Sequence, residues 1–316
     1  MNVVIASLIV AAVAGAASGG TVTRARYLMG TVCQITTGAE SESRIESAFR
    51  EAARIESFLS TWRTESELSR INASHGGVVS PELFDLLKRT GEWANATGGA
   101  FNPLVRPIIE AWRTRGDGAV PPSDVVKAAV MRANPGNLDI GDGTIRLANG
   151  AEIEEGGFGK GYAIERMLAQ LDSQSSIVNF GGQLGVRGTA RVTIADPERR
   201  DVAVAALTIR DASISTSSGS EKTFEIDGVR FTHIVDPRTG QALPPRGSVS
   251  VVARDAFDAD VLSTALYVMH VDDGLRWADA HGVAAVFITP QREIRLSGAM
   301  PRGEIEILDP KFRMKD

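Results

Sequence analysis

The sequence predicts an α+β, or mixed α/β, fold. Segments whose apolar residues recur at helical spacing are mixed with short segments of alternating polarity. The two kinds do not follow a strict strand–helix–strand repeat, which argues against a Rossmann fold and against a barrel. The 316 residues are 43% hydrophobic and 23% charged, a composition that buries a sizeable core and excludes disordered and fibrous proteins.

The predicted helices follow from apolar periodicity and from capping residues. Residues 44–59 place their apolar side chains on one helical face. Ser80 and Pro81 supply an N-cap and a first-turn proline for the next helix. In order, the predicted helices cover residues 44–59, 80–93 and 104–112, a short stretch opening at residues 121–123, and residues 161–171 and 258–280.

The predicted strands are short and lie mostly in the second half of the chain. A β-hairpin over residues 138–147 turns at the sequence Gly-Asp-Gly. The hydroxyl-rich segment SISTSSGS, residues 213–220, is predicted to be a turn whose hydroxyls can donate to phosphate or carbonyl oxygens, with a solvated loop as the alternative. The remaining predicted strands cover residues 26–36 (with a kink at Gly30), 176–180, 185–195, 202–210, 229–236, 283–288 and 304–308.

Charge and cysteine content exclude several classes of function. The chain has 34 basic and 39 acidic residues and a net charge of -5, so no nucleic-acid partner is expected. A single cysteine, Cys33, excludes an internal disulfide framework and a zinc site built on cysteines. The histidines show no metal-ligand spacing; they are His75, His233, His270 and His281.

The amino terminus predicts an export signal. Residues 3–17 are almost entirely apolar, and about fifteen residues are short of the roughly twenty that span a bilayer. The small residues 14–16 fit an A-x-A cleavage pattern, although no Lys or Arg precedes the apolar run. We expect residues 1–20 to be a signal peptide, residues 21–316 to be one functional domain, and the protein to be periplasmic or secreted. An uncleaved membrane anchor and a buried first strand are the alternatives.

The segment EEGGFGKG, residues 154–161, follows a predicted strand and enters a helix. Its glycines leave backbone N–H groups unshielded at a helix N-terminus and Lys160 adds a positive charge, which together favour phosphate. It is not a Walker loop, because Gly161 stands where Ser or Thr is required. A tight structural turn is the alternative interpretation.

Two further segments carry groups suited to phosphoryl chemistry. His233 lies in a predicted strand just before an Asp-Pro turn, where it is either a packing residue or a base active near neutral pH. Asp260 and Thr264, four residues apart, share one helical face and offer the hard oxygen ligands that Mg²⁺ prefers. Alternatively they are an N-cap acid and a core threonine. Combined with the glycine-rich segment, they predict a Mg²⁺-dependent phosphoryl site.

Seven segments, in order along the chain, resemble the ApbE-type family of FAD:protein FMN transferases. They are MGT (29–31), LSTWRTESELSRIN (59–72), TGGAFNP (97–103), EEGGFGKGYA (154–163), NFGG (179–182), HIVDPRTG (233–240) and DADVLSTAL (258–266). The resemblance implies mixed sheets flanked by helices. It also implies transfer of FMN from the substrate FAD to a Thr or Ser hydroxyl of a client flavoprotein, with Mg²⁺ and with release of AMP. Membrane contact would come only through a client or an uncleaved amino terminus.

The resemblance also assigns roles to individual residues. Those that would bind the nucleotide are Met29 and Trp62 at the adenine end, Ala100, Phe101, Asn102 and Glu154 along it, and Lys160 and Ile234 near the diphosphate. Mg²⁺ would be held by the Gly157 carbonyl, the Asp260 carboxylate and the Thr264 hydroxyl. His233 would be the catalytic base for the client hydroxyl.

The chain departs from the family pattern at four places, one of which is Gly159, where the family usually has alanine. The family usually has aspartates where this chain has Gly98, Asn102 and Glu154; Glu154 keeps the charge, whereas Asn102 loses it. Two rival functions remain open. One is an FAD pyrophosphatase, in which water replaces the client hydroxyl; the other is a non-catalytic FAD-binding protein, which the Gly98 and Asn102 changes favour.

Overall fold

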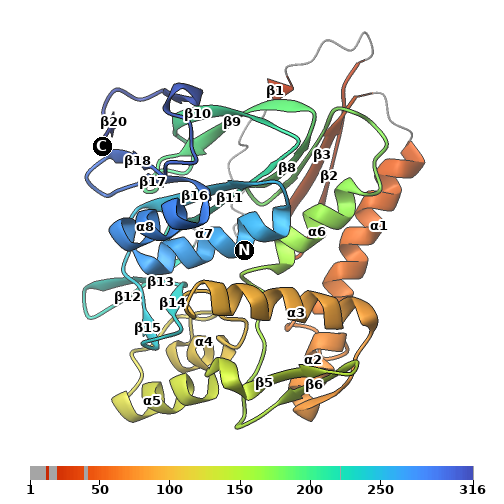
Figure 1. Cartoon of the computed structure of the whole chain (residues 1–316), viewed down its shortest axis with the longest axis vertical. Coiled ribbons are helices and arrows are strands. Elements are labelled where there is room, and N and C mark those ends of the chain that lie inside the picture. Colours follow the sequence, from red (N-terminus) through yellow and green to blue (C-terminus); the bar gives the residue numbers. More distant parts are fainter. Residues whose placement is uncertain (1–11, 14–19, 39–41, 221, 316) are drawn as a thin grey trace.

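The computed structural model describes residues 12–13, 20–38, 42–220 and 222–315. Its centre is a nine-stranded sheet with the strand order β2-β3-β7-β8-β11-β16-β17-β18-β20 (Figure 1). Neighbouring strands are antiparallel except for β18 and β20, which are parallel. The predicted α+β class is confirmed. The strands are β2 Val22–Leu28, β3 Thr31–Thr37, β7 Ser176–Phe180, β8 Gln183–Arg187, β11 Ser213–Ser218, β16 Ser248–Ala253, β17 Ala284–Ile288, β18 Glu293–Leu296 and β20 Arg313–Met314.

The nine-stranded sheet buries a hydrophobic layer on each face, because its side chains alternate between the faces. In β17, Ala285 and Phe287 pack into the larger core, which also contains side chains of α1, α6 and α7. The alternate residues Val286 and Ile288 face a second sheet. The helices are α1 Glu42–Leu59, α6 Gly159–Leu168, α7 Ala256–Met269 and α8 Val271–His281; the second sheet contains β1 Ala12–Val13, β9 Thr189–Ala195, β10 Ala203–Arg210 and β19 Ile305–Ile307.

A group of short helices and small sheets lies below α6 and α7 in the view of Figure 1. Ser80 caps α3 as predicted, since its side chain accepts a hydrogen bond from the Leu83 amide, and the predicted hairpin forms β5 and β6. This region supplies one wall of the site. It contains α2 Glu67–Ser74, α3 Pro81–Ala96, α4 Arg106–Trp112, α5 Ser123–Arg132, β4 Gly76–Val78, β5 Leu138–Gly141, β6 Thr144–Leu147, β12 Thr223–Ile226, β13 Val229–Thr232, β14 Val235–Asp236 and β15 Gln241–Ala242.

Four predicted elements are each divided by a residue with positive φ or by a short break. The strand over 26–36 is a hairpin, because Met29 (φ 46°) and Gly30 (φ 74°) form a turn between β2 and β3. The segment 185–195 is split into β8 and β9 near Gly188 (φ 79°), and the long helix 258–280 is split into α7 and α8 at His270 (φ 73°). The strand over 229–236 is interrupted between β13 and β14, so that His233 lies in the connection and not in a strand.

The prediction of a turn at residues 213–220 is wrong. Ser213–Ser218 form β11, a central strand between β8 and β16. Its hydroxyls are satisfied by neighbours that the local sequence does not reveal: Ser215 and Ser217 share hydrogen bonds with Ser263 of α7. Tertiary pairing therefore overrides the turn preference of serine.

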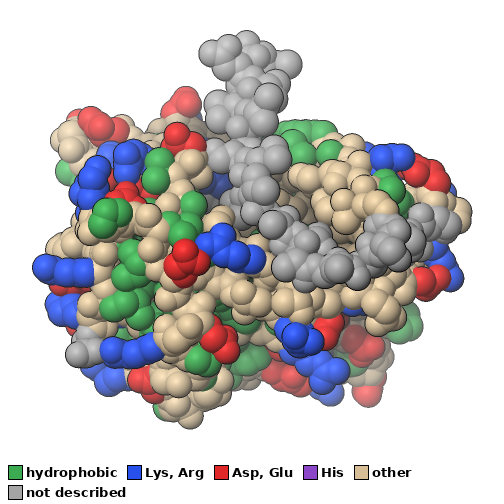
Figure 2. All heavy atoms as spheres, turned by 90° about the horizontal axis from the view of Figure 1, so that it is seen from above, with side chains coloured by type: hydrophobic (Ala, Val, Ile, Leu, Met, Phe, Trp, Pro, Cys, Tyr) green, Lys and Arg blue, Asp and Glu red, His purple; other side chains and the backbone are tan. Residues whose placement is uncertain are grey.

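Most of the predicted signal peptide lies outside the described residues. Its residues 12 and 13 form β1, which pairs antiparallel with Ala190 and Arg191 of β9. Cleavage and export therefore stay predictions. Among the described residues, no helix combines the length and apolar character needed to cross a bilayer. Figure 2 shows Lys and Arg side chains interspersed with Asp and Glu over the face seen from above.

Candidate active site

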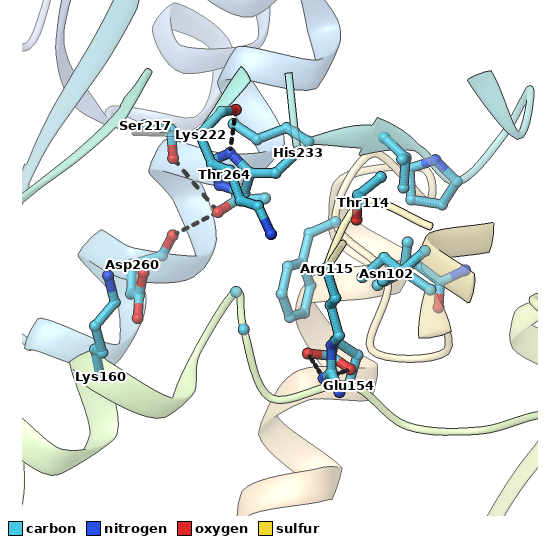
Figure 3. A pocket seen from close by; sticks show the side chains of 18 of the residues that line it. Asn102, Thr114, Arg115, Glu154, Lys160, Ser217, Lys222, His233, Asp260 and Thr264 are labelled. Carbon is cyan, nitrogen blue, oxygen red and sulfur yellow. Dashed lines mark hydrogen bonds and ion pairs between the residues drawn. The ribbon is translucent and has the colours of Figure 1, made fainter. Parts of the chain in front are cut away.

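A cavity of about 300 Å³ lies where the sheet, α7, the start of α6 and the smaller elements meet (Figure 3). Eleven of the twelve predicted site residues line it, although they come from five separate segments of the chain. These are Trp62, Ala100, Phe101, Asn102, Glu154, Gly157, Lys160, His233, Ile234, Asp260 and Thr264.

Met29 is the predicted site residue that does not line the cavity. It lies in the β2–β3 turn, where its amide donates a hydrogen bond to the Glu56 carboxylate. Its terminal methyl group packs beside Gly159 at the start of α6. Met29 thus supports the glycine-rich segment from behind, and its predicted contact with adenine stays a prediction.

The glycine-rich segment brings the start of α6 unusually close to α7. A Cβ on Gly161 would lie 2.4 Å from the Ala256 carbonyl oxygen and 2.6 Å from the Asp260 Cβ. No side chain fits there, which explains why glycine occupies the position of the Walker Ser or Thr. The Gly161 amide donates a hydrogen bond of 2.8 Å to Asp260 Oδ2, so this carboxylate accepts from a helix N-terminus.

Several donors of the predicted phosphate cradle are used within the protein. The amides of Phe158 and Gly159 both donate to the Glu155 carbonyl, and that of Gly161 donates to Asp260. The predicted phosphate cradle therefore has fewer open amides than the sequence pattern suggested, whereas Lys160 lines the cavity.

Asp260 is 3% exposed and is held at both carboxylate oxygens. Oδ2 accepts from the Gly161 amide, and Oδ1 accepts from Gln183 Nε2 at 2.6 Å. One turn later, Thr264 Oγ1 lies 3.3 Å from the Asp260 carbonyl oxygen and 3.5 Å from Ser217 Oγ (Figure 3). The predicted pair therefore presents fixed oxygen atoms to the cavity.

The residues present fit a hard cation. A Cβ on Gly157 would lie 3.8 Å from Thr264 Cγ2, which places the glycine-rich segment against the Asp260–Thr264 face of α7. A carboxylate, a hydroxyl and a main-chain carbonyl form the all-oxygen donor set that Mg²⁺ prefers. Gln183 adds a buried amide oxygen with no hydrogen-bond partner among the described residues. The described residues contain no group of three His, Cys, Asp or Glu side chains arranged for a metal, so a softer ion has no comparable site in them.

His233 is oriented by the main chain of Lys222. Its Nδ1 lies 3.2 Å from the Lys222 carbonyl oxygen, and its amide donates to the same oxygen at 3.1 Å. Because a carbonyl only accepts, Nδ1 carries the proton, and Nε2 is the nitrogen with the basic lone pair. The Lys222 side chain also lines the cavity, where burial lowers the pKa of its ammonium group and nearby Arg115 lowers it further.

Arg115 links the acidic wall of the cavity to an exposed aromatic ring. Its guanidinium binds both oxygens of the buried Glu154 carboxylate and lies 4.4 Å from the centre of the Trp62 ring. Burial raises the pKa of Glu154, and neighbouring Glu155 raises it further, against the effect of Arg115. Trp62 remains 69% exposed, so its indole is supported by a cation and open to stack on a planar ligand.

The Asn102 side chain has a structural use that an aspartate could not share. Its Nδ2 donates to the Ala133 carbonyl oxygen at 2.7 Å, and its Oδ1 accepts from the Leu104 amide at 2.9 Å. A carboxylate has no donor for the first bond. The asparagine therefore fixes the wall of the cavity while losing the negative charge.

Sequence reasoning did not identify Gln183, Arg115 or Lys222, and it included Ser217 only as part of the hydroxyl-rich segment 213–220. Gln183 begins β8 and Ser217 is in β11, and both reach the cavity only because these strands lie beside α7. Arg115 follows α4 in a polar segment with no distinguishing pattern. The sequence feature that could have pointed to Gln183 is the preceding pair Gly181-Gly182. Paired glycines indicate a close approach of the main chain to another group, but they do not indicate a role for the next side chain.

Comparison with known proteins gives one consistent result. The model of the ApbE family matches residues 29–287. A protein of Treponema pallidum named FAD:protein FMN transferase is 31% identical, over 92% of this chain and 90% of its own length. A protein of Klebsiella pneumoniae with the same name is 28% identical, over 92% and 95%. The crystal structure of the ApbE protein of Thermotoga maritima superposes with a TM-score of 0.78 at 27% identity, over 91% of this chain and 97% of that one.

Proposed function

The chain belongs to the ApbE family, and on this premise we propose that it is an FAD:protein FMN transferase that works with Mg²⁺. The FMN half of FAD would move to a Thr or Ser hydroxyl of a client flavoprotein. The observation that carries this proposal is the position of Asp260, Thr264, Lys160 and His233 around one cavity. A cation-binding face, a positive charge for a diphosphate and a neutral base are the parts that such a transfer needs.

Each group has a defined part in the transfer. Asp260, Thr264 and the Gly157 carbonyl would hold Mg²⁺, whose chemistry when bound is to neutralise charge on the diphosphate. Lys160 would bind the diphosphate oxygens, and Trp62 would stack on the adenine. His233 Nε2 would take the proton of the client hydroxyl as that oxygen bonds to the FMN-side phosphorus. The phosphorus–oxygen bond to the AMP half breaks, and AMP leaves with those electrons.

The same site could hydrolyse FAD if water replaced the client hydroxyl, or could bind FAD without reaction. The two hydrogen bonds of the Asn102 side chain weaken the case for a non-catalytic protein, because they give the asparagine a structural role that does not require loss of activity. Mass spectrometry of a client peptide incubated with enzyme, FAD and Mg²⁺ separates the three functions. An FMN-modified peptide supports the transferase; free FMN with AMP indicates hydrolysis; neither product indicates binding alone.

We also propose that the protein acts in the periplasm or outside the cell. The support is the apolar segment at residues 3–17 with small residues at 14–16. Amino-terminal sequencing of the protein isolated from its own cells would test this, since export with cleavage predicts a mature chain that begins between residues 17 and 21.

A further inference from the structure

Gln183 is a buried polar residue of the cavity that has no role so far. It is the first residue of β8, directly after the turn formed by Gly181 (φ 64°) and Gly182 (φ 99°). Its side chain is 7% exposed and lines the cavity. The Nε2 group donates to Asp260 Oδ1, whereas Oε1 is buried without a hydrogen-bond partner among the described residues.

The orientation of this amide follows from its neighbour. An ionised carboxylate only accepts hydrogen bonds, so the amide nitrogen must face Asp260 and the amide oxygen must face away from it. An acceptor that is buried and unpaired costs stability until something donates to it. The amide oxygen is therefore placed to accept from a donor, or to bind a cation, beside Asp260.

Only some kinds of group can interact favourably with Gln183 Oε1. A phosphate oxygen is itself an acceptor and cannot satisfy Gln183 Oε1. A hard cation can, either directly or through a water molecule that it holds, and Mg²⁺ typically keeps several waters in protein sites. The Asp260 carboxylate accepts from the Gly161 amide at Oδ2 and from Gln183 Nε2 at Oδ1, and a carboxylate offers about four lone-pair sites in all.

We propose that Gln183 is a positioning residue of the cation site. Its Nε2 holds the Asp260 carboxylate in place, and its Oε1 accepts a hydrogen bond from a water molecule bound to the cation. The inference rests on the proposed Mg²⁺ dependence and adds to it a residue that recognises the hydrated ion from the sheet side. Gln183 does not contact the reacting phosphorus in this assignment.

The test uses Gln183→Met, which keeps the length of the side chain and removes both polar atoms. Calorimetric titration of MgCl₂ into the FAD-saturated protein, without client, measures the cation directly. We expect Mg²⁺ to bind about 10- to 100-fold more weakly, as is usual when the partner of a metal-bound group is lost. FAD affinity in EDTA and the denaturant midpoint in EDTA should stay at their wild-type values. Gln34→Met, the same change in β3 at a half-buried position outside the cavity, is the matched control.

Transfer kinetics supply a second readout that a merely structural role would not move. The Mg²⁺ concentration for half-maximal transfer should rise by the same factor as the dissociation constant, and the rate at saturating Mg²⁺ should recover. Gln183→Glu keeps an oxygen facing the cation but loses the donor to Asp260, so at pH 8 it should bind Mg²⁺ more tightly than Gln183→Met without reaching the wild-type affinity. Failure of that variant to bind Mg²⁺ better than Gln183→Met would contradict the proposed role of Oε1.

The outcomes also separate this inference from the proposed function. If wild type binds Mg²⁺ and Gln183→Met binds it equally well, the inference is wrong and the transferase proposal stands. A rate loss that saturating Mg²⁺ does not repair likewise overturns the inference. If FAD-saturated wild type binds no Mg²⁺ at all, the metal dependence in the proposed function is wrong, and the inference fails with it.

Discussion

The contact between α6 and α7 at Gly161 gives the sharpest test of how the site is built. In Gly161→Ala the new methyl group would lie 2.4 Å from the Ala256 carbonyl oxygen, about 1 Å short of the 3.4 Å at which ordinary contact begins. Both obstacles are rigid, since one is main chain and the other is the Cβ of Asp260. The two helices must therefore separate by roughly 1 Å, and overpacking of this kind costs about 1–3 kcal/mol of unfolding free energy.

The same displacement should damage catalysis more than stability. It lengthens the hydrogen bond from the Gly161 amide to Asp260, which is 2.8 Å in the intact protein. A misplacement of about 1 Å near a reacting centre can cost roughly 10²-fold in rate. Urea denaturation in EDTA measures the first effect, and the rate of FMN transfer to a client peptide at saturating Mg²⁺ measures the second.

Gly91→Ala is the matched control for this experiment. Gly91 is inside α3, and a Cβ there would meet no atom within 4 Å. The control should be as stable as wild type, or more stable by up to about 1 kcal/mol, because alanine favours a helix over glycine. If Gly161→Ala unfolds at the wild-type urea concentration and keeps its transfer rate, the close packing and the anchoring of Asp260 are both refuted.

Four further outcomes are expected. Asp260→Asn should abolish transfer and Mg²⁺ binding by calorimetry and should lower the urea midpoint in EDTA, because the new amide nitrogen cannot accept the hydrogen bond that one carboxylate oxygen accepted; near wild-type transfer at saturating Mg²⁺ would refute the metal assignment. His233→Ala should still bind FAD and Mg²⁺ but transfer about 10² to 10⁴ times more slowly, and a normal single-turnover rate would exclude a base at this position. FAD should bind more tightly than FMN in titrations of wild type, and Trp62→Ala should reduce that preference; equal affinities in wild type would contradict the adenine assignment. The hydrogen bond from Arg54 holds the pKa of Glu51 below its ordinary value of 4.5, a contribution to stability that is present above that pH and lost as the pH falls through the lowered value. The destabilisation by Arg54→Met, measured by urea denaturation, should therefore be larger at pH 7 than at pH 3, and a pH-independent difference would show that packing alone is responsible.

Local sequence could predict the parts of the site whose chemistry and geometry lie within one segment. The spacing of Asp260 and Thr264 places them on one helical face. The glycines at the start of α6 indicate that the main chain there packs closely against another element, which is α7. The positive φ at Met29 and His270 was not predictable, because neither residue is glycine and each turn depends on how the flanking elements pack. These two turns account for the strand and the helix that the sequence left undivided.

Residues that act across segments could not be found in the same way. Gln183 and Arg115 gain their roles from contacts with Asp260 and Glu154, which lie 77 and 39 residues away in the chain. The hydroxyls of β11 looked like those of a turn because their partner, Ser263, is on a helix that the chain reaches much later. Sequence patterns relate residues that are close along the chain. The roles of Gln183, Arg115 and the β11 serines depend on contacts with residues that are distant along the chain and close in the fold.

The hairpin β12–β13 determines the surroundings of His233. Its first residue pairs with its last, Thr223 with Thr232, and the next pair outward is Lys222 and His233. The His233 amide donates to the Lys222 carbonyl oxygen and so continues the hairpin ladder by one rung, and the ring nitrogen Nδ1 lies 3.2 Å from that same oxygen. The oxygen that orients the imidazole therefore belongs to the main chain of the hairpin. Its position follows the pairing of β12 with β13 and not the side chain at residue 222.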